Sequence, residues 1–441
     1  MKTKRILRWG IVLFLLAALP GLTVALAQGQ EPPAKAPLPA VTERSESLTP
    51  VAANLNESEA NNSMATADVM ALNDVMAGGI GQSGDVDFFK FQVENVGGPD
   101  YAIASQEVLI NIDAFSNGSS LDSVVTLYNA AGTVLGSNDD TDTVDSLYYY
   151  KLEPGWYYIK VQEFDDWIGG ANYTYQLIVS RMILVSAAAA NLGTGTVQGI
   201  PFQSGDILAQ TQVGANNTIK WVMFFDISDL NLNKNVDKLS TVGLSPDILI
   251  GFQVNVTLPG TSIVAKPQDI VRFVPTRYGG STAGTMYRYM IGANHQLTTT
   301  GEKLDAISDW TQGAGNLCLG HPVSTTGTAN VLREGGLVFR PADEDIFCKE
   351  ALNGFGAWKP FIDGSTVPGL AAEDIIAFDY NERMDTAYFV ILGTGNIGGT
   401  AVNQKQILSL YMNPPRWRFV SWNGPAMGWN YNIDAIDVTG Y

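Results

Sequence analysis

Short segments in which apolar and polar residues alternate recur along the chain, and helical spacing of apolar residues is almost absent. Clear examples are segments 89–93, 108–112, 124–128, 157–161 and 173–177, and glycine-containing turn sequences separate them. Such alternation is typical of half-buried β-strands, whose successive side chains point to opposite faces of a sheet. The pattern therefore predicts an all-β fold.

The first 27 residues have the features of a secretory leader. A basic start is followed by an apolar run at 11–19 and by a small-x-small sequence ending at Ala27, so we expect cleavage before Gln28. The apolar run is shorter than the roughly 20 residues that a membrane span requires, and no later stretch approaches that length. We expect a secreted or cell-surface protein, with the periplasm as another destination and an uncleaved membrane anchor as the alternative.

Composition divides the remaining chain into three parts. Residues 28–55 are rich in proline and poor in large apolar groups, which predicts an extended linker. We expect a β-sandwich over residues 56–181 and a repeat domain over residues 182–441. The formal charge of −18 repels nucleic acid, so a nucleic-acid partner is not expected.

Five separated motifs in the predicted sandwich carry a family resemblance. They are ESEANNS at 57–63, GDVDFF at 84–89, LDS at 121–123, NDD at 138–140 and GWYYIKV at 155–161. In this order they resemble the bacterial pre-peptidase C-terminal domain, which implies a jelly-roll-like β-sandwich. Ala60 departs from the pattern, since the family usually has proline there.

The resemblance also implies a calcium site like that of the clostridial collagen-binding modules in this family. Glu57, Glu59 and Asn61 lie on one face if their segment is extended, and calcium prefers six to eight oxygen ligands. The alternative is a solvated acidic segment followed by an ordinary Gly-Asp turn. The ligands that the resemblance implies are Glu57, Glu59, Asn61, Asn62, Asp85 and Asp87.

Residues 182–441 contain a repeated unit, an aromatic strand followed by an aspartate with apolar neighbours. These aspartates are Asp237, Asp305, Asp374 and Asp434, and a second interleaved motif contains Asp206, Asp269, Asp345 and Gln406. Four units predict a small β-propeller closed by pairing the last strand with the first blade, with a closed sandwich or an open solenoid as the alternative. We interpret the first set of aspartates as turn residues that cap the following strand. A ring of carboxylates that binds a cation or sugar hydroxyls is the other interpretation.

Cys318 and Cys348 are the only cysteines. In an oxidising compartment the two cysteines form one disulfide or remain two separate buried thiols, and the sequence leaves both open.

No catalytic signature is present, and we assign no catalytic residues. The two histidines, His295 and His321, lack paired metal-ligand spacing, and nucleophile elbows, phosphate loops and zinc-helix motifs are absent. We expect a calcium-assisted protein that binds an extracellular polymer, either a polysaccharide or a matrix or envelope protein. One alternative is a secreted glycoside hydrolase or lyase with its acids in the repeat domain, and another is a surface scaffold or adhesion module.

Overall fold

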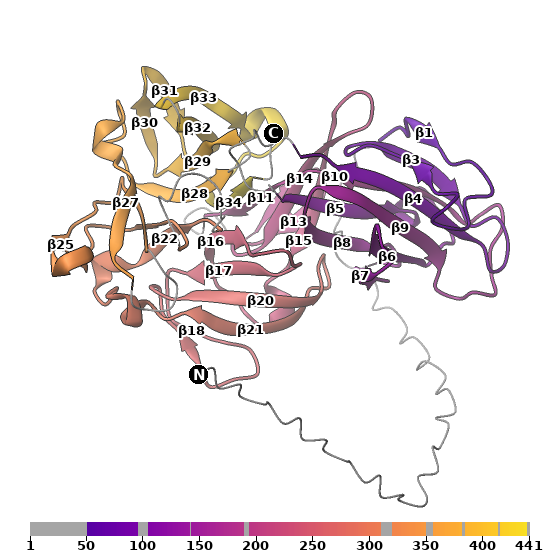
Figure 1. The fold of residues 1–441 in the computed structure, drawn as a ribbon, viewed down its shortest axis with the longest axis horizontal. Helices are drawn as coiled ribbons and strands as arrows, with labels where there is room; N and C mark the ends of the chain where they lie inside the picture. The colour runs from indigo at the N-terminus through magenta and orange to yellow at the C-terminus, as the bar shows by residue number, and fades with distance from the viewer. Residues whose placement is uncertain are drawn as a thin grey trace, which may run out of the picture. The chain divides into compact units, whose positions relative to one another are not determined.

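The computed structural model describes residues 51–95, 105–141, 143–188, 194–309, 320–349, 356–381, 384–412 and 415–438. Within these ranges the regular elements are β-strands and short 3-10 helices, so the all-β prediction is confirmed (Figure 1). The predicted leader and the linker up to residue 50 lie outside the described residues. No helix in the described ranges is long and apolar enough to cross a membrane.

The described strands between residues 55 and 180 pair with one another in two five-stranded sheets. One sheet has the order β1-β3-β10-β5-β8 and the other β2-β4-β9-β6-β7. The strands are β1 (Leu55–Asn56), β2 (Asp68–Val69), β3 (Val75–Gly79), β4 (Val86–Val93), β5 (Gln106–Asp113), β6 (Ser123–Asn129), β7 (Val134–Asn138), β8 (Leu147–Leu152), β9 (Gly155–Glu163) and β10 (Thr174–Ser180).

The core between the two sheets follows from the alternation in the sequence. Phe89, Phe91 and Val93 of β4 are buried, whereas the residues between them are partly exposed. They pack in one apolar cluster with Val108 and Ile110 of β5, from the other sheet. Each buried side chain of this size contributes about 1.5–3 kcal/mol. The five predicted strand segments are therefore confirmed as strands.

Beyond β10 the described strands form four four-stranded antiparallel sheets and four two-stranded hairpins. The four-stranded sheets have the orders β15-β14-β11-β34, β16-β17-β20-β21, β22-β23-β26-β27 and β28-β29-β32-β33. A two-stranded hairpin is inserted in the same place in each sheet. Hairpin β12-β13 follows β11, β18-β19 follows β17, β24-β25 follows β23, and β30-β31 follows β29.

The bounds of these elements are as follows. The strands are β11 (Ile183–Ala187), β12 (Gly195–Val197), β13 (Ile200–Phe202), β14 (Ile207–Val213), β15 (Thr218–Phe225), β16 (Val236–Thr241), β17 (Ile248–Phe252), β18 (Val256–Thr257), β19 (Val264–Ala265), β20 (Ile270–Arg277), β21 (Ala283–Met290), β22 (Leu304–Ile307), β23 (Val323–Thr325), β24 (Val331–Leu332), β25 (Val338–Phe339), β26 (Ile346–Lys349), β27 (Trp358–Ile362), β28 (Ile375–Asn381), β29 (Thr386–Ile391), β30 (Thr394–Ile397), β31 (Thr400–Asn403), β32 (Gln406–Met412), β33 (Pro415–Asn423) and β34 (Ile433–Val438). The 3-10 helices are η1 (Phe115–Asn117), η3 (Ser228–Leu230), η4 (Gly292–His295), η5 (Thr300–Glu302), η6 (Glu334–Gly336), η7 (Gly364–Thr366) and η9 (Gly424–Met427).

The four strands β16, β22, β28 and β34 come together where their sheets meet. Each contacts the next in chain order, and β34 also contacts β16 (Figure 1). β34 completes the sheet of β11, β14 and β15 by pairing antiparallel with β11, with Val185 opposite Ile436. The last strand therefore joins the sheet that begins the repeat region.

The second repeated motif is a turn that ties each sheet together. One carboxylate oxygen of Asp206, Asp269 and Asp345 accepts a hydrogen bond from the backbone N–H three residues earlier. The other oxygen accepts from a backbone N–H just after the outer strand, such as that of Gly292 for Asp269. These aspartates are the turn residues of the repeat, because both carboxylate oxygens are used in shaping the backbone.

The other set of aspartates does not occupy turns, so our interpretation of it was wrong for three of the four. Asp237, Asp305 and Asp434 each lie second in an inner strand, β16, β22 and β34 respectively. Asp374 directly precedes β28. In sequence the two repeated motifs look alike, because each places an aspartate beside apolar residues.

The described residues from 51 to 438 belong to one compact unit, and its core is continuous from the first sheets into the repeat region. The ring of Tyr149 in β8 packs edge-on against Phe224 of β15, at 5.4 Å between centroids. Lys151 of β8 pairs with Asp309, with Nζ 2.7 Å from the carboxylate, and both side chains are buried. A buried pair of this kind fixes the geometry, because removing one partner leaves the other charge uncompensated.

Cys348 is fully buried in β26, and Cys318 lies outside the described residues. A disulfide between them stays a prediction.

Candidate metal site

The segment between β1 and β2 crosses from one sheet to the other at one end of the sandwich. β1 pairs parallel with β3 at the edge of the first sheet, and β2 pairs parallel with β4 at the edge of the second. Backbone hydrogen bonds attach this segment at both sides: Glu57 N–H donates to Ala77 O, and Phe88 N–H donates to Asn61 O, each at 3.0 Å. The segment is thereby fixed over the start of β4, where Asp87 lies.

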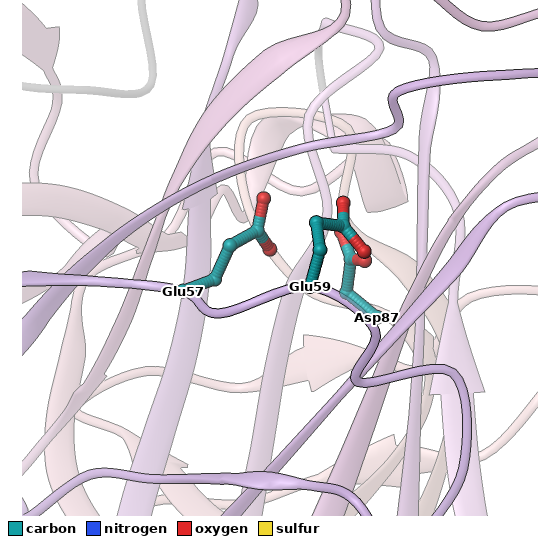
Figure 2. Close-up of side chains that lie close together, drawn as sticks. All are labelled: Glu57, Glu59 and Asp87. Carbon is teal, nitrogen blue, oxygen red and sulfur yellow. The ribbon is translucent and has the colours of Figure 1, made fainter.

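Three carboxylates meet at this point, and we name them the front cluster: Glu57, Glu59 and Asp87. One oxygen from each lies within 4.8 Å of the others. Figure 2 shows Glu57 and Glu59 on the crossing segment and Asp87 beside them on the neighbouring strand. Asp87 is fully buried, Glu57 is half-buried and Glu59 is exposed, so the cluster reaches from the core to solvent.

Two donors hold the inner part of the front cluster. The Tyr175 hydroxyl lies 2.6 Å from Asp87 Oδ2 and 3.3 Å from Glu57 Oε2. The Gly79 N–H donates to Glu57 Oε1 at 2.6 Å. Because a phenol has one proton, Tyr175 cannot compensate both carboxylates.

Two buried oxygens beside these donors are left without a partner. Asp87 Oδ1 and Asn61 Oδ1 receive no hydrogen bond from any described residue. Leaving a buried acceptor unsatisfied costs about 1–3 kcal/mol. A hard cation satisfies oxygens of this kind, so the residues present fit a metal ion.

The electrostatics of the front cluster favour protonation when no cation is bound. Burial raises the pKa of Asp87 to about 8, opposed by the Tyr175 hydrogen bond and reinforced by the charge of Glu57. Burial also raises the pKa of Glu57. The pKa of Glu59 is raised by burial and by the charges of Asp85 and Asp68. A bound divalent cation reverses this balance, because its charge favours the ionised carboxylates.

The other predicted ligands are placed differently from one another. Asn61 is fully buried and donates its Nδ2 to Asp68 Oδ2 at 3.3 Å, which leaves its Oδ1 available. Asp85 accepts from the Gly81 N–H at 2.8 Å and from Asn62 Nδ2 at 3.1 Å. Asp85 and Asn62 are therefore bonded to each other and to the turn, and do not belong to the three-carboxylate group.

Sequence reasoning missed Tyr175, Asp68 and the tight approach at Gly78. A Cβ on Gly78 would lie 2.5 Å from Tyr175 Cζ and 2.7 Å from Glu57 Oε2, so only glycine leaves room there. No local sequence signal identified these residues, because they reach the front cluster through strand pairing: Tyr175 and Gly78 through the pairing of β10 with β3, and Asp68 through the pairing of β2 with β4.

A cavity of about 300 Å³ lies in the repeat region, between neighbouring sheets. Its lining mixes apolar and polar groups, and consists of Ile183, Tyr388, Ile407, Ser409, Ser421, Trp422 and Val438. Glycoside hydrolysis needs a pair of carboxylates beside the substrate, and none of the described residues that line this cavity carries one.

Comparison with solved structures finds 13 chains that resemble part of this one, among them a pre-peptidase C-terminal domain. The pre-peptidase C-terminal domain of a collagenase from Bacillus anthracis is 17% identical to the matched part, which covers 26% of this chain and 94% of that one, with a TM-score of 0.21. No protein-family model matches the chain. No curated protein matches it either. A likeness of this size says nothing about ligands or activity.

Proposed function

We propose that the protein is exported and binds an extracellular polymer, with a calcium ion fixing the start of its sandwich. The observation that carries the proposal is the front cluster, three carboxylates within 4.8 Å beside two unpartnered buried oxygens. Calcium suits this set because all its donors are oxygens. Zinc is disfavoured, because structural zinc sites use cysteine and histidine.

Glu57, Glu59 and Asp87 would supply the charge, and Asn61 would add a neutral carbonyl oxygen. The ion offsets the repulsion among the carboxylates and ties the crossing segment to β4. Because the ion binds the folded chain, its binding free energy adds to the stability of the sandwich.

The binding surface that we propose lies next to this site, on the loop that carries Trp167. The side chain of Trp167 is 82% exposed, and that of Ile168 next to it is also exposed. The loop is attached to the turn that carries Asp85: Ser83 Oγ donates to Asp166 O at 3.2 Å, and Gly170 N–H donates to Ile80 O at 2.8 Å. Exposed tryptophan supplies a large rigid contact area for a sugar ring or a peptide.

We further propose that the four repeat sheets are blades of a small β-propeller, with β34 on β11 as its closure. The contacts of β16, β22, β28 and β34 in cyclic order support this arrangement. Radial repetition of this kind leaves only short strand edges exposed.

The test uses a glycan and matrix-protein array probed with the wild type in calcium and in chelator, and with the variants Trp167→Ala and Glu59→Gln in calcium. We expect the wild type to bind at least one target in calcium. This binding should weaken with chelator, with Glu59→Gln and with Trp167→Ala. A matched control is Tyr287→Ala, which removes another exposed aromatic side chain, on β21. Binding that ignores both chelator and Trp167→Ala would contradict the proposal.

A further inference from the structure

The strands of the repeat sheets that meet at the centre, β16, β22, β28 and β34, each contain a register shift. The pairing register shifts across Asp237 in β16, across Asp305 in β22 and at Asp434 in β34. In β28 the shift falls at Ile376, and the carboxylate there comes from Asp374 just before the strand. A bulge adds a residue that does not pair across the strand and turns its side chain out of the regular alternation. Three sheets use this device to present an aspartate where the inner strands meet.

These aspartates lie close to one another, three of them buried and Asp374 partly exposed, and we name Asp237, Asp305, Asp374 and Asp434, with Asn235 and Lys238, the axial cluster. Asp237, Asp305 and Asp434 are at most 5% exposed. Lys238 is fully buried, with its Nζ 2.6 Å from Asp237 Oδ1. Asn235 Nδ2 donates to Asp434. One ammonium contacts these acids directly and the charge of Lys303 also acts on Asp237, so the four acidic groups outnumber the two cations.

Several oxygens of the axial cluster receive no hydrogen bond from any described residue. They are Asp237 Oδ2, both oxygens of Asp305, Asp374 Oδ1 and Asn235 Oδ1. Asp305 is the most buried case, at 2% exposed: no amide, hydroxyl or ammonium group donates to either oxygen, and its neighbour is the carboxyl group of Asp374, with which it shares a hydrogen bond when one of the two is protonated.

The Asp305 carboxyl faces the rest of the cluster. Its pKa is raised well above the usual range by burial and then by the charge of Asp374, with Lys238 acting in the opposite direction. The charge of Asp237 in turn adds to the burial that raises the pKa of Asp434 to about 7. The unsatisfied oxygens therefore belong to groups that act on one another across three sheets.

We propose that the axial cluster binds a divalent hard cation that keeps part of its water shell. The unsatisfied atoms are all carboxylate or amide oxygens, the donors that calcium and magnesium take. Among the described residues, three carboxylates come within 4.8 Å of one another only in the front cluster. The axial carboxylates are more widely spaced, so water bridges the ion to some of them, as magnesium often permits.

The experiment counts ions bound to the full chain by titration calorimetry, with calcium chloride and separately with magnesium chloride. It uses the wild type, Glu59→Gln in the front cluster, Asp305→Asn in the axial cluster, and Asp345→Asn as the matched control. Both carboxylate oxygens of Asp345 accept backbone N–H groups, so this residue has none left for an ion.

We expect Glu59→Gln to retain a binding event that Asp305→Asn loses or weakens at least tenfold, while Asp345→Asn keeps the wild-type count. Asp374→Asn, at the more open side of the axial cluster, should weaken the same event and serves if Asp305→Asn does not fold. Without ions, Asp305→Asn should melt no lower than the wild type, because its amide N–H can donate to Asp374 in place of the protonated carboxyl. Unchanged ion counts and affinities in Asp305→Asn and Asp374→Asn would overturn the proposal, as would a Glu59→Gln variant that takes up no ion. If only the ion-binding event assigned to the front cluster is missing, the proposed function is contradicted and the proposal of an axial site is not.

Discussion

Replacing Asp87 with asparagine should change the stability of the protein in opposite directions with and without calcium. In the wild type without calcium, the carboxyl is buried beside Glu57, and its pKa is raised from 3.8 to about 8. Asparagine keeps the shape and an acceptor for Tyr175, but it removes the charge. Without calcium at pH 8 the Asp87→Asn variant should therefore be the more stable protein, and in calcium the less stable one.

The pH dependence has a definite sign. Between pH 4 and pH 8 the folded wild type binds more protons at this site than the unfolded chain, so its stability without calcium falls as the pH rises across that window. At about 1.36 kcal/mol per pH unit the loss is on the order of 5 kcal/mol at most, and Glu57 shares it. The variant should show a flatter profile over the same window.

Calcium acts in the opposite direction. At a concentration 100 times the dissociation constant, one bound ion stabilises the folded state by about 2.7 kcal/mol. The wild type should gain that amount at pH 8, and the variant should gain clearly less.

The assay is urea unfolding of both proteins at pH 5 and pH 8, with calcium and with chelator, together with limited proteolysis of residues 56–90. Chelator should speed cleavage in this segment of the wild type. If Asp87→Asn is less stable than the wild type without calcium, and both respond equally to calcium, the reasoning about the front cluster is refuted.

Three further outcomes follow from particular contacts. Gly78→Ala should lower calcium affinity in calorimetry by at least about tenfold, because its Cβ displaces the Glu57 carboxylate, whereas Gly301→Ala, with 3.7 Å to its nearest neighbour, should not. Lys151→Met should cost about 3–5 kcal/mol in urea unfolding, since it removes the buried ammonium that pairs with both Asp309 and Glu107, and a cost under 1 kcal/mol would contradict this. Trp167→Ala should leave the melting temperature unchanged within error, because the side chain is 82% exposed, so a clear drop would place it in the core instead.

Local patterns in the sequence were sufficient to predict about half of the sandwich strands and the main strands of the repeat region, but not the short hairpins. The alternation at 89–93 correctly predicts which residues of β4 are buried. The aromatic segments of the repeat region lie in the outer strands of their sheets, such as β15 and β27. Period-two burial is a short-range property, so it can be read without knowing which strands pair.

The partners of each carboxylate were not predictable in the same way. Glu57, Glu59 and Asp87 were selected from their motifs, but Tyr175 and Gly78 reach them from strands distant in sequence. The repeated aspartates show the same limit. Asp269 and Asp305 both stand beside apolar residues, yet one shapes a turn and the other is buried where strands meet, because register shifts are set by strand pairing.

The pairing of β34 with β11 has a consequence for the order in which this protein acquires its structure. Partners about 250 positions apart, such as Ile183 and Val438, meet only after the intervening sheets have been synthesised, and such distant contacts form slowly. Until then β11 presents an unpaired edge to other chains, which is a hazard for association between nascent molecules. Shielding of Ile183–Ala187 until β34 has formed would therefore protect the protein at its most vulnerable stage.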